Sequence, residues 1–373
     1  MKVKKIYSEQ PEVEIWERLL KYTYPENINK YFRKNHNSQP SDELINIISG
    51  SLSQAYEYFS LSNHSSLQLS PLLIYYGSTN LILGSLCLVY GKLLKIRNHG
   101  MKLGELSGID RIGDVTLNII DNKTGGLSIF INEYNLYKQE FSSKIAWSFE
   151  ELAGSLVELS NDFLELYGHD NIHTIPIREI ILDNEVQYRV NLDIFNETQV
   201  STLLMSISDF SKSYFPFEKN RNNELIIRKK IHGKKLHKVT TMGENFFLAG
   251  YMKDGKQISF PYFSLFLMLL FMLGMLCRYN PEFWNPFVER DISGERNFVE
   301  KLIRVSRRQL PNLMLDLLTG EKNIYNMHFD LNEDKRKNLS EEDIKELIEK
   351  ELNLRRLPWW VLIWNICLNY VKI

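Results

Sequence analysis

Five side chains near the ends of two long apolar segments have the chemistry of an anion-binding site. Tyr76 and Asn80 lie one helical turn apart in the first apolar segment, and Arg97 and His99 follow it. Arg278 follows the second apolar segment in the same way. Guanidinium groups bind phosphate through several N–H donors, and an imidazole exchanges a proton near neutral pH. If the two segments pack side by side, we expect these residues to form one anion-binding mouth.

The same residues also have structural explanations. The tyrosine and the asparagine stack on one helix face, which Gly84 and Cys87 continue with small side chains. On one interpretation they are polar groups of a buried helix that face a ligand or partner. On the other they form a hydrogen-bonded pair in the core, next to a stripe of small residues that lets another helix pack closely. Arg97 and His99 are typical of a helix C-terminus, where the helix dipole favours cations.

The run RKKIHGKKLHK (228–238) is a second candidate binding element. Its six cations are Arg228, Lys229, Lys230, Lys234, Lys235 and Lys238. We expect two strands joined by a turn, a hairpin that could follow nucleic-acid phosphates and bind more weakly as salt rises. The alternative is a solvated hairpin whose charge is balanced by acidic residues elsewhere, because no aromatic residues interleave the charges as stacking platforms.

Known catalytic and cofactor motifs are missing from the sequence. There is no GxxxxGK[ST], no GxGxxG, no GxSxG and no HExxH. Cys87, Cys277 and Cys367 are far apart and the histidines are scattered, so we expect neither a metal site nor a cofactor. A sparse, odd set of cysteines in apolar segments also favours a reducing compartment over a disulfide framework.

Composition limits the partners of the chain. It has 373 residues with 45 Lys and Arg against 46 Asp and Glu, so no global field attracts it to nucleic acid or to an anionic membrane. The first twenty residues lack the apolar core of a secretory signal. The apolar run 263–277 is shorter than a membrane span and is better interpreted as a buried core helix. We therefore expect a cytoplasmic protein that does not contact a membrane.

The elements that must position these residues are mainly helical at both ends of the chain. In region 1–110, WERLLKYTYPENINKYF predicts one amphipathic helix, DELINIISGSLSQAYEYFSLS predicts a second capped by Ser41, and a third runs from Pro71 to Lys95. Region 261–373 is predicted to be helical to its end, and to pack on the first region. Its apolar tail, residues 354–373, either folds back or forms an interface with a protein partner or a second copy.

Region 111–260 is predicted to be an α+β insert. DVTLNII and GGLSIFIN predict two strands around the turn DNKTGG, followed by a helix over 148–167 that Ser148 caps and Gly168 ends. Two strands are expected in 176–195, a helix over 198–214, and a β-meander over 224–260. The predicted fold class is α+β and predominantly helical, with terminal helices forming a core around this insert.

Four segments together resemble the YaaC-like family of bacterial proteins. They are PLLIYYGSTNLI (71–82), RNHG (97–100), MLCRYNPEFW (275–284) and QLPNLMLDLL (309–318), and the resemblance covers about residues 15–320. It implies a bacterial, cytosolic protein and little about chemistry. Relatives near mobile or defence genes would imply a partner-dependent role in antiviral defence.

A looser similarity is to HEPN-type helical domains, many of which are RNases or toxins. Tyr75, Tyr76, His99 and Gly100 match their tyrosine pair and His-Gly turn. Their catalytic signature, Arg and His separated by four to six residues, is missing, since Arg97 and His99 are separated by one residue.

Two function classes follow from these observations. The first is a non-catalytic binding or assembly module of a bacterial multi-component system that engages nucleic acid or a nucleotide-like anion. The alternative is an HEPN-like, metal-independent RNase or toxin with a rearranged active site that uses His99, Arg97 and Tyr76.

Overall fold

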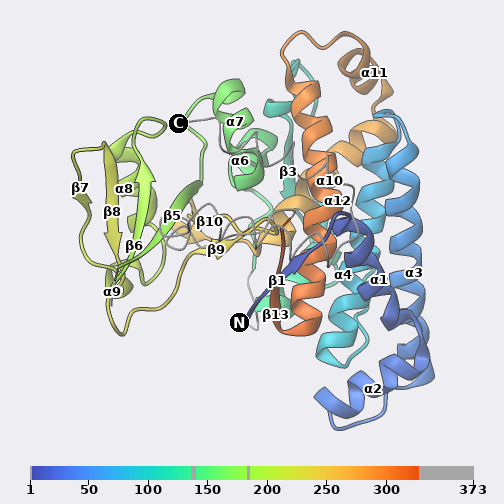
Figure 1. The fold of residues 1–373 in the computed structure, drawn as a ribbon. Coiled ribbons are helices and arrows are strands. Elements are labelled where there is room, and N and C mark those ends of the chain that lie inside the picture. The colour runs from blue at the N-terminus through green and yellow to red at the C-terminus, as the bar shows by residue number, and fades with distance from the viewer. Residues whose placement is uncertain (1, 136–139, 183–184, 327–373) are drawn as a thin grey trace, which may run out of the picture. The chain divides into compact units, whose positions relative to one another are not determined.

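The computed structural model describes residues 2–135, 140–182 and 185–326 of the chain. Of the described residues, 51% are helical and 18% lie in strands of small sheets (Figure 1). The predicted α+β class with helix predominating is therefore confirmed. The helix expected from Ser340 and the apolar tail 354–373 lie outside the described residues.

The N-terminal part contains one strand and four α-helices. They are β1 (Lys2–Tyr7), α1 (Pro11–Leu20), α2 (Pro25–Asn35), α3 (Asp42–His64) and α4 (Ser70–Tyr90), with the 3-10 turn η1 (Lys21–Thr23) between α1 and α2. The single helix predicted over WERLLKYTYPENINKYF is wrong, because Tyr24 is extended before Pro25 and the chain restarts there. The Ser41 cap is confirmed, since its hydroxyl accepts from the backbone N–H of Leu44 at 3.3 Å.

Helix α4 is the central element of the helical core. It packs against α3, α10 (Tyr262–Tyr279) and α12 (Glu295–Thr319) (Figure 1). A Cβ at Gly84 would lie 3.0 Å from Cγ of Leu52, so the small-residue stripe does allow α3 a close approach. The predicted end at Lys95 is wrong: Gly91 adopts the left-handed conformation at φ 65°, which ends the helix after Tyr90.

Helices α4 and α10 are long and apolar enough to cross a membrane by length and composition. Within the fold, 61% and 83% of their most apolar windows are buried, and the two helices pack on each other. This burial agrees with the prediction that 263–277 is a core helix. The remaining C-terminal elements are α11 (Pro281–Arg290) and β13 (Glu321–Asn326), so the prediction of helix throughout this region is wrong at β13.

The described strands of the central region form three sheets. A three-stranded sheet has the order β2-β3-β4, a six-stranded sheet has the order β7-β8-β6-β5-β10-β9, and β11 pairs with β12. Their bounds are β2 (Met101–Leu103), β3 (Thr116–Ile119), β4 (Ala146–Ser148), β5 (Thr174–Leu182), β6 (Glu185–Asn191), β7 (Glu218–Lys219), β8 (Glu224–Arg228), β9 (Lys238–Val239), β10 (Asn245–Leu248), β11 (Tyr251–Lys253) and β12 (Lys256–Ile258). The strand pair expected in 176–195 is confirmed as antiparallel β5 and β6. The predicted meander is wrong, because β9 and β10 join the far edge of the sheet.

Helices of the central region are shorter than predicted. They are η2 (Ile112–Asp114), α5 (Gly126–Asn135), α6 (Phe149–Ala153), η3 (Val157–Leu159), α7 (Ser160–Tyr167), α8 (Glu197–Met205) and α9 (Phe210–Ser213). The Ser148 cap is confirmed, since its hydroxyl accepts from the backbone N–H of Glu151 at 3.1 Å. The helix that it caps breaks at Gly154, where the backbone packs so closely on the carbonyl of Asn171 that a Cβ would clash. The helix predicted over 198–214 also breaks, at Asp209, whose φ is 62°.

The largest error concerns GGLSIFIN, predicted as a strand and observed as α5. The first N–H groups of this helix, those of Gly126 and Leu127, donate to the carbonyls of Asn98 at 2.9 Å and His99 at 3.2 Å. Free N–H groups at a helix start need such acceptors, and here a distant segment supplies them. Tertiary contacts therefore override the local β preference of this apolar run.

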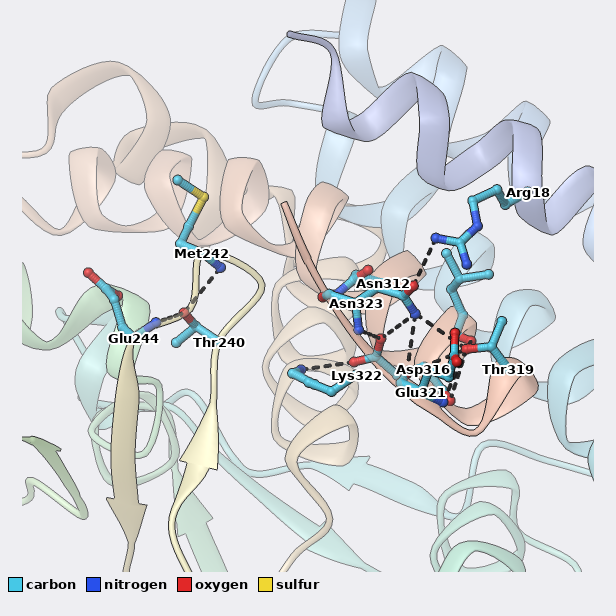
Figure 2. Close-up of polar contacts among 11 residues, drawn as sticks. Arg18, Thr240, Met242, Glu244, Asn312, Asp316, Thr319, Glu321, Lys322 and Asn323 are labelled. Atoms are coloured by element: carbon cyan, nitrogen blue, oxygen red, sulfur yellow. Dashed lines mark hydrogen bonds and ion pairs between the residues drawn. The ribbon is translucent and has the colours of Figure 1, made fainter. Parts of the chain in front are cut away.

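The pairing of β1 with β13 brings residues far apart in the sequence into one parallel ladder. Figure 2 shows the polar cluster beside it: buried Asp316 on α12 accepts from the amine of Lys322 at 2.9 Å and from the backbone N–H of Asn323 at 2.7 Å. The amide oxygen of Asn323 accepts from Arg18 of α1 at 2.9 Å. This cluster ties β13 to α12 and to α1.

Candidate anion-binding site

A cavity of about 270 Å³ lies where α4, the segment after it, α5 and α10 meet. Its lining residues are Tyr75, Tyr76, Thr79, Asn80, Ile96, Arg97, Asn98, His99, Met101, Gly126, Leu127, Phe130 and Leu267. Four of the five predicted anion-binding residues line this cavity directly, and the fifth, Arg278, contacts Tyr76. No Asp or Glu belongs to the described lining.

A partly buried hydrogen bond orients the imidazole of His99. The hydroxyl of Tyr75 lies 2.7 Å from its Nδ1, and Tyr75 is 1% exposed. Phe271 of α10 packs against both rings, with centroid distances of 5.6 Å to Tyr75 and 5.8 Å to His99. Burial raises the pKa of Tyr75, so this group stays a neutral phenol whose hydroxyl can donate a hydrogen bond to Nδ1 or accept one from it.

Two effects favour the neutral form of His99. Burial lowers the pKa of its imidazole, and the nearby positive charge of Arg278 lowers it further. Nε2 of His99 has no hydrogen-bond partner among the described residues, while Nδ1 is engaged by Tyr75. A bound ligand would therefore meet Nε2.

Arg278, in the last turn of α10, lies beside the cavity through its contact with Tyr76. Its guanidinium donates to the hydroxyl of Tyr76 and lies 6.0 Å from the centre of that ring. It also lies 4.8 Å from the ring of Tyr279. The structure thus brings Arg278 beside Tyr76 and close enough to His99 to affect its pKa. The juxtaposition expected from the two apolar segments is present.

Arg97 and Asn80 contribute polar groups that no described protein group satisfies. Both line the cavity, and neither side chain has a hydrogen bond or ion pair with the described residues. Arg97 is exposed and lies six residues after the left-handed Gly91, so capping of α4 does not explain it. Tyr76 and Asn80 were also interpreted as a hydrogen-bonded pair, but the described structure has no hydrogen bond between them.

The segment that carries Arg97 and His99 is held by the DNKTGG turn. The side chain of Asn98 donates to Asp121 at 2.8 Å, and Asp121 also accepts from the N–H groups of Lys123 and Thr124. These bonds hold the pKa of Asp121 well below its ordinary value. The turn was predicted to join two strands, and its observed role is to fix the backbone beside His99.

Two glycines make this arrangement possible. Gly100 has a φ of 77°, and a Cβ at Gly125 would lie 2.4 Å from the Cα of Gly100. Backbones can approach this closely only where side chains are missing. Sequence reasoning did not identify the contributions of Gly125, Gly126, Phe130 and Leu267 to the site, and the paired glycines of the turn were the available signal.

The basic run 228–238 does not form the predicted hairpin. Strand β8, which ends at Arg228, pairs with β6 and β7, whereas β9 starts at Lys238 and pairs with β10 at the opposite edge of the sheet. The intervening residues run from β8, which lies next to the edge strand β7, to β9 at the opposite edge, because each strand pairs with other strands.

Several charges of this run have protein partners. Arg228 pairs with Glu218 at 2.5 Å, Lys234 pairs with Asp209 at 3.1 Å, and Lys230 donates to the carbonyl of Ser211 at 2.7 Å. The cations Lys229, Lys235 and Lys238 form no ion pair with described residues. Nucleic-acid binding through this segment stays a prediction, with fewer available charges than the sequence suggested.

Comparison with known proteins places the chain in a family. A family model described as YaaC-like Protein matches residues 12–318, which include the whole cavity and Arg278. No curated protein and no solved structure matches the chain. The match agrees with the first resemblance drawn from the sequence and does not extend to HEPN-type domains. The chain therefore belongs to the YaaC-like family.

Proposed function

We propose that this protein is a binding module that takes a phosphate-bearing, nucleotide-like anion in the cavity between α4 and α10. The observation that carries the proposal is the convergence of Arg97, Arg278 and His99 on a cavity whose described lining has no carboxylate. Unpaired guanidinium groups at a partly enclosed site attract anions, and Asn80 adds an uncharged donor. The cavity of about 270 Å³ suits a phosphate with an attached sugar-sized group.

Calorimetric titration with AMP and with inorganic phosphate tests this proposal. Arg97→Ala and Arg278→Ala each remove one charged hydrogen-bond donor, so we expect each to weaken binding by roughly tenfold or more. Arg33→Ala is the matched control, because Arg33 is an exposed arginine of α2 outside the cavity. Equal affinities for the control and the two cavity variants would overturn the proposal.

A second candidate function is RNA cleavage without a metal, and the Tyr75–His99 hydrogen bond favours it. An imidazole held at one nitrogen by a buried partner is positioned to accept or donate a proton at the other, as a general base or acid does. Arg97 and Tyr76 line the same cavity and supply groups that bind phosphate.

Incubation with labelled single-stranded RNA in the presence of EDTA separates the two functions. Cleavage that disappears in His99→Ala while the melting temperature is kept would establish the RNase. Intact RNA together with measurable AMP binding would leave the binding module as the function.

A further inference from the structure

We infer that the cavity selects a phosphomonoester dianion over a phosphodiester, and that binding protonates the imidazole of His99, which then presents an N–H at Nε2 to the ligand. The inference rests on the proposed function and goes further, because it names the class of anion and the residue that responds to it. Three features carry it: the two guanidinium groups, the engagement of Nδ1 by Tyr75, and the lack of a described carboxylate in the lining.

Charge balance favours the dianion. Arg97 and Arg278 form no ion pair with any described residue, so the protein presents two permanent positive charges at this site. A phosphomonoester carries close to two negative charges at neutral pH, since its second pKa is about 6. A diester carries one, and would leave one guanidinium without a counter-charge in a partly enclosed cavity.

The hydrogen bond to Tyr75 is compatible with both charge states of His99. In the neutral imidazole one nitrogen carries hydrogen and the other accepts, and Tyr75 can donate to Nδ1 or accept from it. A protonated His99 therefore keeps its bond to the phenol oxygen and presents an N–H at Nε2 to the ligand. No rearrangement of the buried tyrosine beyond rotation of its hydroxyl is needed.

The surroundings of His99 explain why the proton arrives with the ligand. Facing it are Tyr75 and Tyr76 from α4, Arg278 from α10 and Arg97 from its own segment, while α5 contributes only apolar residues and glycine. Burial and the charge of Arg278 oppose a positive charge on the imidazole. The negative charge of a bound dianion favours the protonated imidazole and raises the pKa of His99. By linkage, the affinity of the protein for the dianion rises as pH falls.

The test compares AMP, cyclic AMP and adenosine by calorimetry at pH 7.5 in two buffers of different ionisation enthalpy. These three probes carry a phosphomonoester, a phosphodiester and no phosphate on the same nucleoside. We expect AMP to bind on the order of tenfold more tightly than cyclic AMP, with uptake of roughly half a proton or more per AMP. His99→Gln keeps an N–H donor near the position of Nε2 but cannot titrate, so AMP should still bind while the uptake disappears.

The outcomes separate this inference from the proposed function. Equal binding of AMP and cyclic AMP, still sensitive to Arg97→Ala, would overturn dianion selection and leave the binding function standing. The same proton uptake in His99→Gln as in the wild-type protein would overturn the role of His99. Absence of binding by AMP and by inorganic phosphate at millimolar concentration would overturn both proposals.

Discussion

The hydroxyl of Tyr75 lies 2.7 Å from Nδ1 of His99, and this bond joins the central helix of the fold to the segment that carries the candidate ligand-binding groups. Phe271 of α10 packs on both rings, so the bond lies where α4 and α10 are in contact. The geometry of the site thus depends on packing of the helical core.

Tyr75→Phe should remove the hydrogen bond that orients His99 without creating a cavity in the core. The ring stays, but Nδ1 loses its partner, which costs about 1 kcal/mol of stability and lets the imidazole rotate. We expect AMP affinity to fall several-fold and the NMR-detected titration of His99 to move. Tyr58→Phe is the control, because no described group hydrogen-bonds to the Tyr58 hydroxyl. An unchanged His99 titration in Tyr75→Phe would contradict the orienting role.

Gly125→Ala should displace the segment 97–100. The new Cβ would lie 2.4 Å from the Cα of Gly100 and 2.5 Å from the carbonyl oxygen of Asp121, both of which are backbone atoms that cannot rotate away. We expect a loss of roughly 1–3 kcal/mol in the free energy of unfolding, together with loss of AMP binding.

Gly50→Ala provides the control of opposite sign. Gly50 lies inside α3 and a Cβ there meets nothing within 4 Å. Alanine should therefore raise the free energy of unfolding by about 0.5–1 kcal/mol through its higher helix propensity. Chemical denaturation measures both variants, and stabilisation by Gly125→Ala would refute the close approach.

His237 should make the fold sensitive to mild acid. It is 7% exposed, and both ring nitrogens are buried without a hydrogen-bond partner among described residues. The centre of its ring lies 4.7 Å from the centre of the Tyr188 ring. Burial, and then the charge of Lys235, lower its pKa to about 3. Between pH 6.5 and about 3 the unfolded chain binds a proton that the folded chain excludes, so the stabilising effect is complete above pH 6.5 and declines as pH falls.

His237→Phe should remove this sensitivity, since phenylalanine fits an aromatic environment and forfeits no side-chain hydrogen bond. Relative to the wild-type protein, the variant should gain about 2 kcal/mol between pH 7 and pH 5. Urea denaturation at the two pH values measures the difference. His232→Gln, at an exposed histidine, should show no such gain. Parallel pH profiles for wild type and His237→Phe would show that His237 is not the responsible group.

Charge reversal tests the basic segment separately from the cavity. Lys229→Glu and Lys235→Glu alter cations without ion pairs among the described residues, so neither breaks a described salt bridge. If the segment follows phosphates, binding of single-stranded RNA should weaken and its salt dependence should fall by about one unit of slope per lost contact. Lys34→Glu on α2 is the control. Unchanged RNA affinity would exclude this surface as a nucleic-acid interface.

The amino-acid sequence by itself determined the elements whose signals are local. Long apolar runs predicted the core helices α4 and α10, and the run 176–195 predicted β5 and β6. Ser41 and Ser148 predicted the N-caps of α3 and α6. These features follow from side-chain periodicity and from hydrogen bonds within a few residues, so neighbouring positions contain the information.

Tertiary structure alone decided what depends on a distant partner. The apolar run at α5 is a helix whose first N–H groups bond to the carbonyls of Asn98 and His99. The basic run does not form a hairpin, because β8 pairs with β6 and β7 whereas β9 pairs with β10. The bond between Tyr75 and His99 and the approach of Arg278 to Tyr76 likewise join positions that no local pattern relates. The physical reason is that burial and strand pairing are satisfied across the whole chain, and they outweigh the small propensities of short segments.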